Sequence, residues 1–129
     1  MDITKLRKWG FGGNVVLANK LQQLVLEGKK TATTGLYKGA SQVLPKVGDL
    51  AMIMSYEDKP FCIIEYTKIT LIPFLDVTYE YITKEGEGDK DVESWRNSHR
   101  DFLLREYPDS FTEDSLVICE EFRVMKTLA

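Results

Sequence analysis

The sequence predicts an α+β domain in which mostly antiparallel strands dominate and helices lie at the sides. Three observations support this class. Several segments alternate apolar and polar residues, as half-buried strands do. Two longer segments repeat apolar residues every three or four positions, as amphipathic helices do. Strands and helices do not alternate regularly as they do in βαβ units, so a parallel α/β sheet is not expected.

The bulk properties indicate one folded domain over residues 1–129, with 43% hydrophobic and 29% charged residues. No apolar run approaches the roughly 20 residues of a membrane-spanning helix. The N-terminal residues lack the apolar segment of a secretion signal, so we expect a cytoplasmic protein without membrane contact. A net charge of −3 argues against tight, non-specific nucleic-acid binding, so any RNA contact must come from a local basic patch.

Two long helices are predicted from apolar periodicity. The first spans residues 14–27, with Asn14 as its N-cap and Gly28 suited to end it. The second begins after Asp91, and its recurring face contains Val92, Trp95, His99, Phe102 and Leu103. A short helix is expected over residues 76–83.

Strands are predicted around residues 28–35 and at 49–54, 61–71 and 116–125, with a hairpin joining the second and third. The glycine- and proline-containing segments 36–48 and 84–89 are expected to be loops. We expect Cys62 and Cys119 to be buried free thiols because neither has the close spacing of a metal or redox motif. The expected core residues include Ile53, Ile63, Ile64 and Phe122.

Residues 28–33, Gly-Lys-Lys-Thr-Ala-Thr, are the main candidate for a working site. Two ammonium groups and two hydroxyls beside a helix end suit the binding of phosphate or the polarisation of a carbonyl. On residue types alone, a solvated basic turn explains the segment more simply. In a strand, Lys29 and Lys30 point to opposite faces, so at most one enters the fold. The buried one is the candidate base or nucleophile, and the other is free to contact phosphate.

The remaining polar residues each have two interpretations. His99 is the only histidine, which excludes a multi-histidine metal site and leaves a core or a site role. Trp95 is either core or a platform for base stacking. Arg96 and Arg100, one helical turn apart, either bind phosphate together or solubilise the helix. The acidic segment 85–89 lacks the glutamate of a calcium loop, so it is either solvated or turns one carboxylate toward a lysine. We expect no metal and no cofactor.

The order and spacing of several motifs resemble stand-alone bacterial proteins of the ASCH family. The motifs are Trp-Gly-Phe-Gly-Gly at 9–13, the segment 24–33, Glu-Gly-Glu-Gly-Asp at 85–89, and Trp95-Arg96 with His99, with shorter matches at 45–49 and 72–74. The resemblance covers nearly the whole chain. It implies a PUA-like β-barrel of mostly antiparallel strands flanked by about three helices, with a cleft lined by the Gly-x-Lys region. It also implies RNA, a nucleoside or a nucleotide as ligand, with no dedicated protein partner.

Some members of this family are similar to hydrolases: one branch deacetylates acetylated cytidine, and others are described as ribonucleases. Carried over by position, Lys30 is the base, Thr33 the activated hydroxyl, and Glu87 the carboxylate that orients Lys30. The chain departs from the short amidohydrolases at Thr34-Gly35, where they have an apolar residue and an arginine, and it is longer than they are. Lys30 and Thr33 also have opposite strand parity, so they share a site only if the backbone bends between them.

The ligand-binding residues expected around this centre are Lys29, Thr31, Trp95, Arg96, His99 and Arg100. The alternative to a hydrolase is a module that binds RNA or a nucleotide in the same cleft without a reaction. It predicts salt-sensitive binding and no product.

Overall fold

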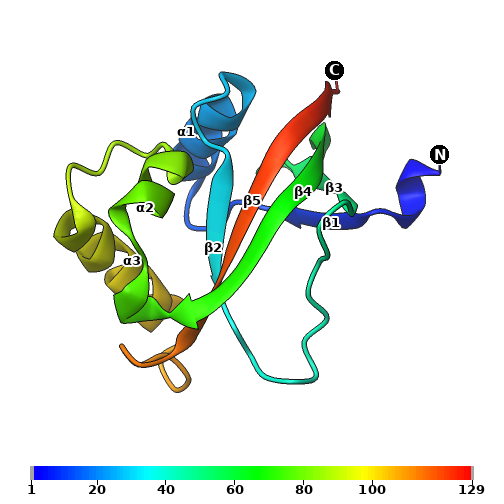
Figure 1. Cartoon of the computed structure of the whole chain (residues 1–129). Coiled ribbons are helices and arrows are strands. Elements are labelled where there is room, and N and C mark those ends of the chain that lie inside the picture. The colour runs from blue at the N-terminus through cyan, green and yellow to red at the C-terminus, as the bar shows by residue number, and fades with distance from the viewer. Residues whose placement is uncertain (1, 129) are drawn as a thin grey trace.

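The computed structural model describes residues 2–128, which form a curled sheet of five strands with three α-helices (Figure 1). The strands are β1 (Arg7–Gly10), β2 (Ala32–Leu36), β3 (Leu50–Met54), β4 (Pro60–Pro73) and β5 (Leu116–Thr127). The helices are α1 (Val15–Leu26), α2 (Tyr79–Glu85) and α3 (Val92–Glu106), with short 3-10 turns at Ile3–Lys5 and Phe74–Asp76. The predicted α+β class is confirmed.

The sheet has the strand order β1-β3-β4-β5-β2. The β1–β3 pair is parallel and the other pairs are antiparallel. Register shifts near Ile63 and between Tyr66 and Lys68 interrupt the long ladder of β4 with β5, and such bulges bend a strand. The curled sheet is a half-barrel whose open edges are β1 and β2, which confirms the PUA-like architecture implied by the family resemblance.

Most predicted elements are present with ends shifted by one or two residues, and the expected β3–β4 hairpin is confirmed. Strand β1 was not expected, because its four residues are too few to show alternation. The expected strand 28–35 begins only at Ala32. Helix α2 runs to Glu85, so the predicted loop 84–89 is wrong at its first two residues.

Gly86 explains where α2 ends and how it packs. Its φ of +66° is the left-handed conformation in which glycine commonly terminates a helix. A Cβ at this position would lie 1.9 Å from the carbonyl oxygen of Lys29, so only glycine allows this approach. Next to it, the Thr31 backbone N–H donates to the Lys84 carbonyl at 2.7 Å. The end of α2 is therefore fixed against the turn that precedes β2.

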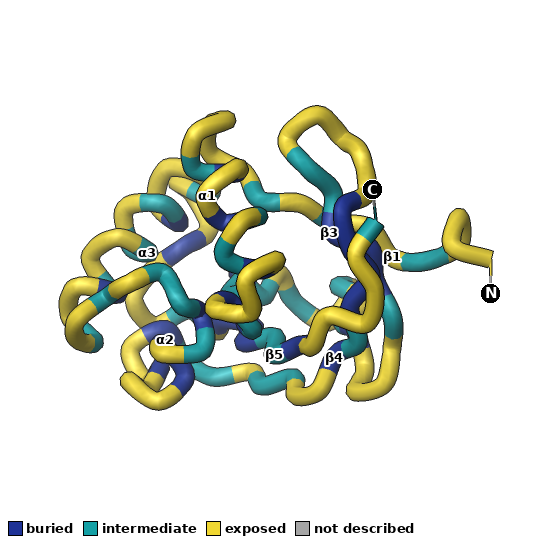
Figure 2. Tube along the Cα trace, turned by 90° about the horizontal axis from the view of Figure 1, so that it is seen from above, coloured by how far each residue is buried: buried dark blue, intermediate teal, exposed yellow. Residues whose placement is uncertain are grey.

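Two apolar clusters fill the fold, one on each face of the sheet. The helix-side cluster packs α2 and α3 against β2 and β5, and its largest members are Phe74, Trp95 and Phe111. The half-barrel cluster packs α1 against β3, β4 and β5 and contains Ile53, Ile64, Tyr66 and Phe122. All four predicted core residues and both free cysteines are buried. Figure 2 shows the buried stretches following the strands, while the outer turns of the helices are exposed. Between residues 2 and 128, no helix is long and apolar enough to cross a membrane.

Candidate functional site

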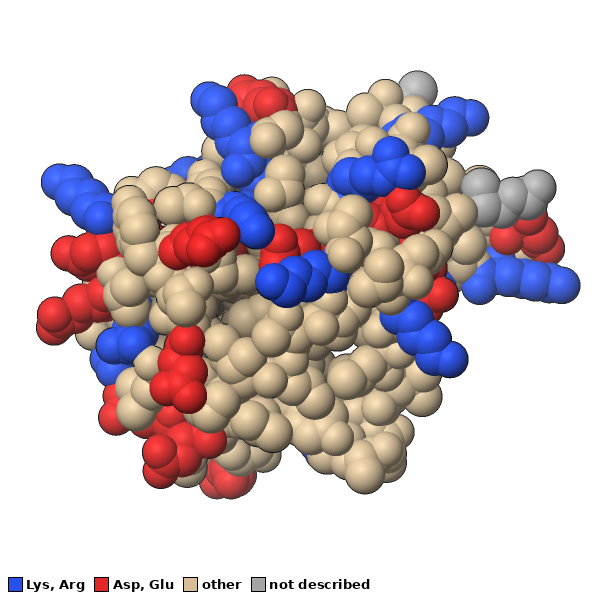
Figure 3. Space-filling model, in the orientation of Figure 1, with Lys and Arg blue, Asp and Glu red and all other residues tan. Residues whose placement is uncertain are grey.

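A cavity of about 400 Å³ lies beside β2, one of the two edge strands of the sheet. Its walls come from β1 and the segment after it, from α1, from the turn before β2, and from α3. Figure 3 shows a hollow in the surface near the middle of the view, with basic and acidic side chains interspersed around it. The residues that line the cavity and carry polar or aromatic groups are Trp9, Phe11, Lys30, Thr33, Thr34, Glu85, Glu87, Ser98, His99, Phe102 and Arg105.

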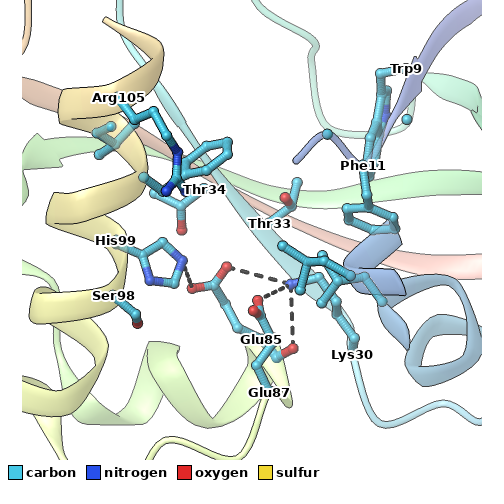
Figure 4. Close-up of a pocket in the computed structure, with 16 residues that line it drawn as sticks. Trp9, Phe11, Lys30, Thr33, Thr34, Glu85, Glu87, Ser98, His99 and Arg105 are labelled. Atoms are coloured by element: carbon cyan, nitrogen blue, oxygen red, sulfur yellow. Dashed lines mark hydrogen bonds and ion pairs between the residues drawn. The ribbon is translucent and has the colours of Figure 1, made fainter. Parts of the chain in front are cut away.

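Lys30 is the buried member of the lysine pair, with an exposed fraction of 2%. Its Nζ lies 2.7 Å from Glu87 Oε2 and 3.5 Å from Glu85 Oε1. Figure 4 marks these contacts with dashed lines. The Phe11 ring lies on another side of the ammonium, 5.7 Å away. Lys29, in contrast, is exposed and pairs with Glu27 at 3.3 Å. The prediction that only one of the two lysines enters the fold is confirmed.

Glu85 is a buried carboxylate that the sequence analysis did not single out. One oxygen faces Lys30, and the other accepts hydrogen bonds from Trp95 Nε1 and, at 3.3 Å, from His99 Nε2. Burial alone raises the pKa of this carboxyl, but the charge of Lys30 and the hydrogen bond from His99 outweigh burial and hold the pKa below its usual range. Glu85 is therefore ionised at neutral pH.

His99 lies between two acceptors. Its Nδ1 is 3.0 Å from the Trp95 carbonyl oxygen and its Nε2 faces Glu85. Because a carbonyl and a carboxylate only accept hydrogen bonds, the ring satisfies both as an imidazolium. Burial lowers the pKa of His99, but the hydrogen bond and charge of Glu85 outweigh burial and raise it above the usual value. The ring also stacks on Trp95, with centroids 4.1 Å apart.

These four groups form a charge cluster, defined here as Lys30, His99, Glu85 and Glu87. Two cations balance two carboxylates, so the cluster is neutral when all four are ionised. The ligand atoms of Glu85, Glu87 and His99 also lie within 4.8 Å of one another, a spacing that a metal ion could use. The Lys30 ammonium already contacts both carboxylates, so an entering cation would meet its positive charge. The donor set fits an ammonium better than a metal.

Thr33 and Lys30 line the same cavity although their positions have opposite strand parity. This is possible because Lys30 precedes β2 and does not follow its alternation. The Thr33 hydroxyl makes no hydrogen bond with any described residue, whereas its carbonyl accepts one from the Tyr81 hydroxyl at 2.7 Å. The neighbouring Thr34 hydroxyl lies 3.0 Å from the same phenol oxygen. Thr33 thus presents a free hydroxyl to the cavity.

The other residues expected to bind a ligand lie outside the cavity wall. Thr31 donates its backbone N–H and, at 3.3 Å, its hydroxyl to the carbonyl of Lys84, which ties β2 to α2. Lys29 lies on the surface, paired as described above. Both side chains have contacts within the chain that explain their positions without a ligand.

On α3, only His99 of the four predicted residues reaches the cavity. Trp95 has an exposed fraction of 0%, so its ring has no free face on which a base could stack. Arg96 donates to the carbonyl of Leu75, and Arg100 donates to Glu113 at 2.6 Å. Both arginines therefore make contacts within the chain, although the buried Nε of Arg96 has no hydrogen-bond partner among the described residues.

Sequence reasoning missed Glu85 and Arg105. Glu85 follows Tyr81 and Ile82 at steps of four and three, so it lies on the buried face of α2, a signal hidden by the expected loop. Arg105 lies in the last turn of α3, where a basic residue favours the helix C-terminus. Nothing in the sequence distinguishes that role from its position at the cavity.

The family model described as the ASCH domain matches residues 7–126. Among curated proteins, none matches the chain. A crystal structure of a protein from Enterococcus faecalis V583 is 30% identical with a TM-score of 0.85, covering 100% of this chain and 86% of that chain. The ASCH domain from Lactobacillus crispatus JV V101 is 32% identical with a TM-score of 0.81, covering 92% of this chain and 79% of that chain.

A mutant of an ASCH protein from Zymomonas mobilis is only 10% identical, with a TM-score of 0.57, covering 85% of this chain and 69% of that chain. This likeness concerns the fold alone. ASCH domains are generally related to RNA binding. Because the family model spans almost the whole described fold and the two nearer structures share about 30% of its sequence, the chain belongs to the ASCH family.

Proposed function

We propose that the protein is a hydrolase that cleaves an acyl amide on a nucleobase, in a modified nucleoside or in RNA. The observation that carries this proposal is the buried Lys30 ammonium, which lies 2.7 Å from Glu87 in the wall of a cavity that also exposes the Thr33 hydroxyl. An amine that contacts a proton acceptor in a desolvated site is suited to acid–base catalysis. A free hydroxyl in the same cavity is suited to attack a carbonyl.

The proposed reaction begins with transfer of a proton from Lys30 to Glu87. The neutral amine takes the hydroxyl proton of Thr33 as the Thr33 oxygen attacks the acyl carbon. The resulting Lys30 ammonium gives that proton to the amino nitrogen of the base, which departs and leaves the acyl group on Thr33 as an ester. Water then attacks the ester with Lys30 as base, the carboxylic acid is released, Thr33 regains its proton from Lys30, and Glu87 returns its own.

Glu85 and His99 act in this scheme as positioning residues. Glu85 lies 3.5 Å from the Lys30 ammonium on the side opposite its contact with His99, so it holds Lys30 while His99 and Trp95 hold Glu85. The three partners restrict the carboxylate to one orientation. This arrangement keeps the Lys30 amine directed into the cavity through repeated proton transfers.

The charge balance favours an amide over a phosphodiester as the reacting bond. The positive charge of Lys30 is already matched by two carboxylates, one buried and one partly buried. A phosphodiester would bring a further negative charge toward these carboxylates, whereas an acyl amide is neutral. The family resemblance includes both deacetylating and ribonuclease branches, and the cluster fits the first of them.

One observation favours the second candidate, a module that binds a nucleotide without a reaction. Arg105 lines the cavity and makes no ion pair with any described residue, so its guanidinium is available for a phosphate. Trp9 and Phe11 on the opposite wall offer aromatic surface to a base. These features serve a nucleotide substrate equally well.

The deciding experiment is mass spectrometry of a panel incubated with the protein: acylated nucleosides including acetylated cytidine, the matching 5′-nucleotides, and a short single-stranded RNA. We expect deacylated product from the wild type and at least a hundredfold less from Lys30→Ala, in line with the loss of a general base. Lys29→Ala is the matched control, because this neighbouring lysine is exposed, and it should retain activity. Circular dichroism of each variant checks folding.

If Lys30→Ala is folded and as active as the wild type, the proposed chemistry is wrong. If the wild type yields no product but binds the nucleotides, with affinity that falls as salt is raised, the binding module is the correct function.

A further inference from the structure

A second cavity, of about 360 Å³, lies where β2 ends. The residues that line it are Leu36, Tyr37, Lys38, Tyr107 and Ser110. They continue the two segments that border the first cavity, which is lined by Thr33 and Thr34 of β2 and by α3 residues as far as Arg105. The two cavities therefore follow one another along β2 and the C-terminal end of α3.

Backbone hydrogen bonds hold both walls of the second cavity in place. The Tyr37 N–H donates to the Leu116 carbonyl at 3.0 Å, which continues the pairing of β2 with β5. On the other wall, the Tyr107 N–H donates to the Leu103 carbonyl at 2.8 Å as the C-cap of α3, and the Tyr107 carbonyl accepts from the Phe111 N–H at 3.0 Å. A ligand between the two tyrosines would therefore meet walls that are already ordered, which lowers the entropic cost of binding.

The second cavity combines aromatic surface with positive charge. Tyr37 and Tyr107 are both partly exposed. The exposed Lys38 places its ammonium over the Tyr107 ring, 5.1 Å from the centroid, and makes no ion pair with any described residue. A cation–π contact at an exposed site is weak, so a planar ligand can replace the ammonium on the ring. None of the described residues that line this cavity is acidic.

Arg105 connects the two cavities. It lines the first cavity and precedes Tyr107 of the second by two residues. Figure 4 shows Arg105 and Lys30 on opposite sides of the first cavity, so an anion at Arg105 would lie away from the carboxylates around Lys30. Cations that bind the backbone and aromatic rings that stack the bases are the two features with which proteins hold single-stranded nucleic acids.

We propose that the second cavity is a subsite for the nucleotide that flanks the target base in a single-stranded RNA, while the target base itself occupies the first cavity. The flanking base stacks on Tyr107, Arg105 binds the phosphate that joins the two nucleotides, and Lys38 binds the phosphate beyond. Stacking accepts any base, so the subsite favours an RNA strand without selecting its sequence. The inference rests on the proposed function in taking the first cavity as a nucleobase site, but it requires no reaction.

The test measures by calorimetry the equilibrium binding of two synthetic RNA dinucleotides. In one, adenosine is attached to the 5′ side of cytidine, and in the other to the 3′ side, with a terminal phosphate beyond the adenosine in both. The reference ligands lack the adenine base but keep both phosphates. For the wild type, at least one intact dinucleotide should bind about tenfold more tightly than its reference, which is the size of gain that one stacked base supplies.

Two variants separate the contribution of the base from that of the phosphate. Tyr107→Leu keeps an apolar side chain against the core but removes the ring, so the intact and the reference ligand should bind equally. Lys38→Ala should weaken both ligands and reduce the slope of log affinity against log salt concentration by about 0.7. Lys59→Ala, which removes an exposed lysine from the β3–β4 turn, is the matched control and should behave as the wild type. Circular dichroism checks that the variants are folded.

Three results would overturn the inference. The wild type could bind the intact ligands no more tightly than the references, or bind neither; a folded Tyr107→Leu could keep the wild-type gain; or Lys38→Ala and Lys59→Ala could show the same salt dependence. The hydrolase is decided separately. Deacylation of free nucleosides by a protein that shows no gain from the flanking base supports the hydrolase and removes the subsite. The gain without any deacylated product does the reverse.

Discussion

The polar side chains on the two faces of strands β2 and β5 differ in whether they have partners within the chain. On the face covered by α2 and α3, the Glu121 carboxylate binds a lysine of α2 at 2.9 Å and the Thr34 hydroxyl lies 3.0 Å from a buried phenol. On the opposite, concave face of the half-barrel, the Thr33 hydroxyl and the Glu120 carboxyl have no partner among the described residues. On these two strands, the polar groups packed under α2 have partners within the described part of the chain, whereas those on the concave face do not.

The charge cluster lies where these two faces meet, at the free edge of β2. It has features of both: its groups are paired, as on the covered face, and they line the cavity, as on the concave face. It should therefore contribute to stability as well as to function. Variants can separate those contributions.

The largest effect is expected from Glu85→Gln, which removes the central carboxylate of the cluster. Lys30 and His99 would then share only Glu87, and breaking a buried ion pair typically costs about 3 to 5 kcal/mol. Urea denaturation measures the free energy of unfolding. Glu121→Gln, which removes a more exposed ion pair, should cost much less. If Glu85→Gln and Glu121→Gln lose the same free energy of unfolding, the buried cluster is no more important for stability than the more exposed ion pair.

A smaller loss of stability is expected from Gly86→Ala, which alters the contact between the end of α2 and the turn before β2. The added Cβ would press on the Lys29 carbonyl and the residue has a φ of +66°, so we expect a loss of about 2 to 4 kcal/mol. Gly88→Ala is the control, because Gly88 has a φ of +88° but no atom within 4 Å of the added Cβ. Its cost should be the backbone strain alone, about 1 kcal/mol. Thermal or urea unfolding measures both variants. If Gly86→Ala and Gly88→Ala lose the same free energy of unfolding, the close contact with the Lys29 carbonyl does not explain the need for glycine at position 86.

The smallest effect is expected in the pH dependence of stability. Burial raises the pKa of Glu120 to about 7, so the folded protein holds this proton more tightly than the unfolded chain. The associated stability is complete at low pH and is lost as pH rises through the folded pKa, by about 1 to 3 kcal/mol. The raised pKa of His99, in which the hydrogen bond and charge of Glu85 outweigh burial, acts in the same direction.

Urea unfolding at a series of pH values should therefore show stability falling as pH rises through neutrality. Glu120→Gln should flatten part of that fall, whereas Glu121→Gln should not. If the free energy of unfolding of the wild type instead rises over the same pH interval, the folded protein does not hold Glu120 in its protonated form.

Much of the fold was predictable from local patterns. Caps and apolar periodicity located α1 and α3, with Asn14 and Asp91 accepting hydrogen bonds from their first turns as N-caps do. Alternation indicated that at most one of Lys29 and Lys30 enters the fold without saying which, and the role carried over for Glu87 led to a residue that contacts Lys30. The short strand β1 left no such pattern, and it became visible only through its pairing with β3.

The rest of the site depends on contacts that no local pattern records. Glu85 reaches Lys30 across 55 positions of the chain because Gly86 allows a close backbone approach. Arg96 and Arg100 looked like a phosphate-binding pair, but their partners lie on distant segments. Glu120 and Glu121 are adjacent and identical in type, so only the sheet register distinguishes the free carboxyl from the paired one.

The sheet order has a consequence for when the site can form during synthesis. Strand β5, made after every other described strand, lies between β4 and β2 and supplies all of the ladder that holds β2 in the sheet. While a ribosome is still translating residues 116–127, the Thr33 segment has no strand to pair with, although α3 and its histidine have already been made. The cavity is therefore among the last features to appear on the nascent chain, and a partly synthesised protein cannot yet hold a ligand there.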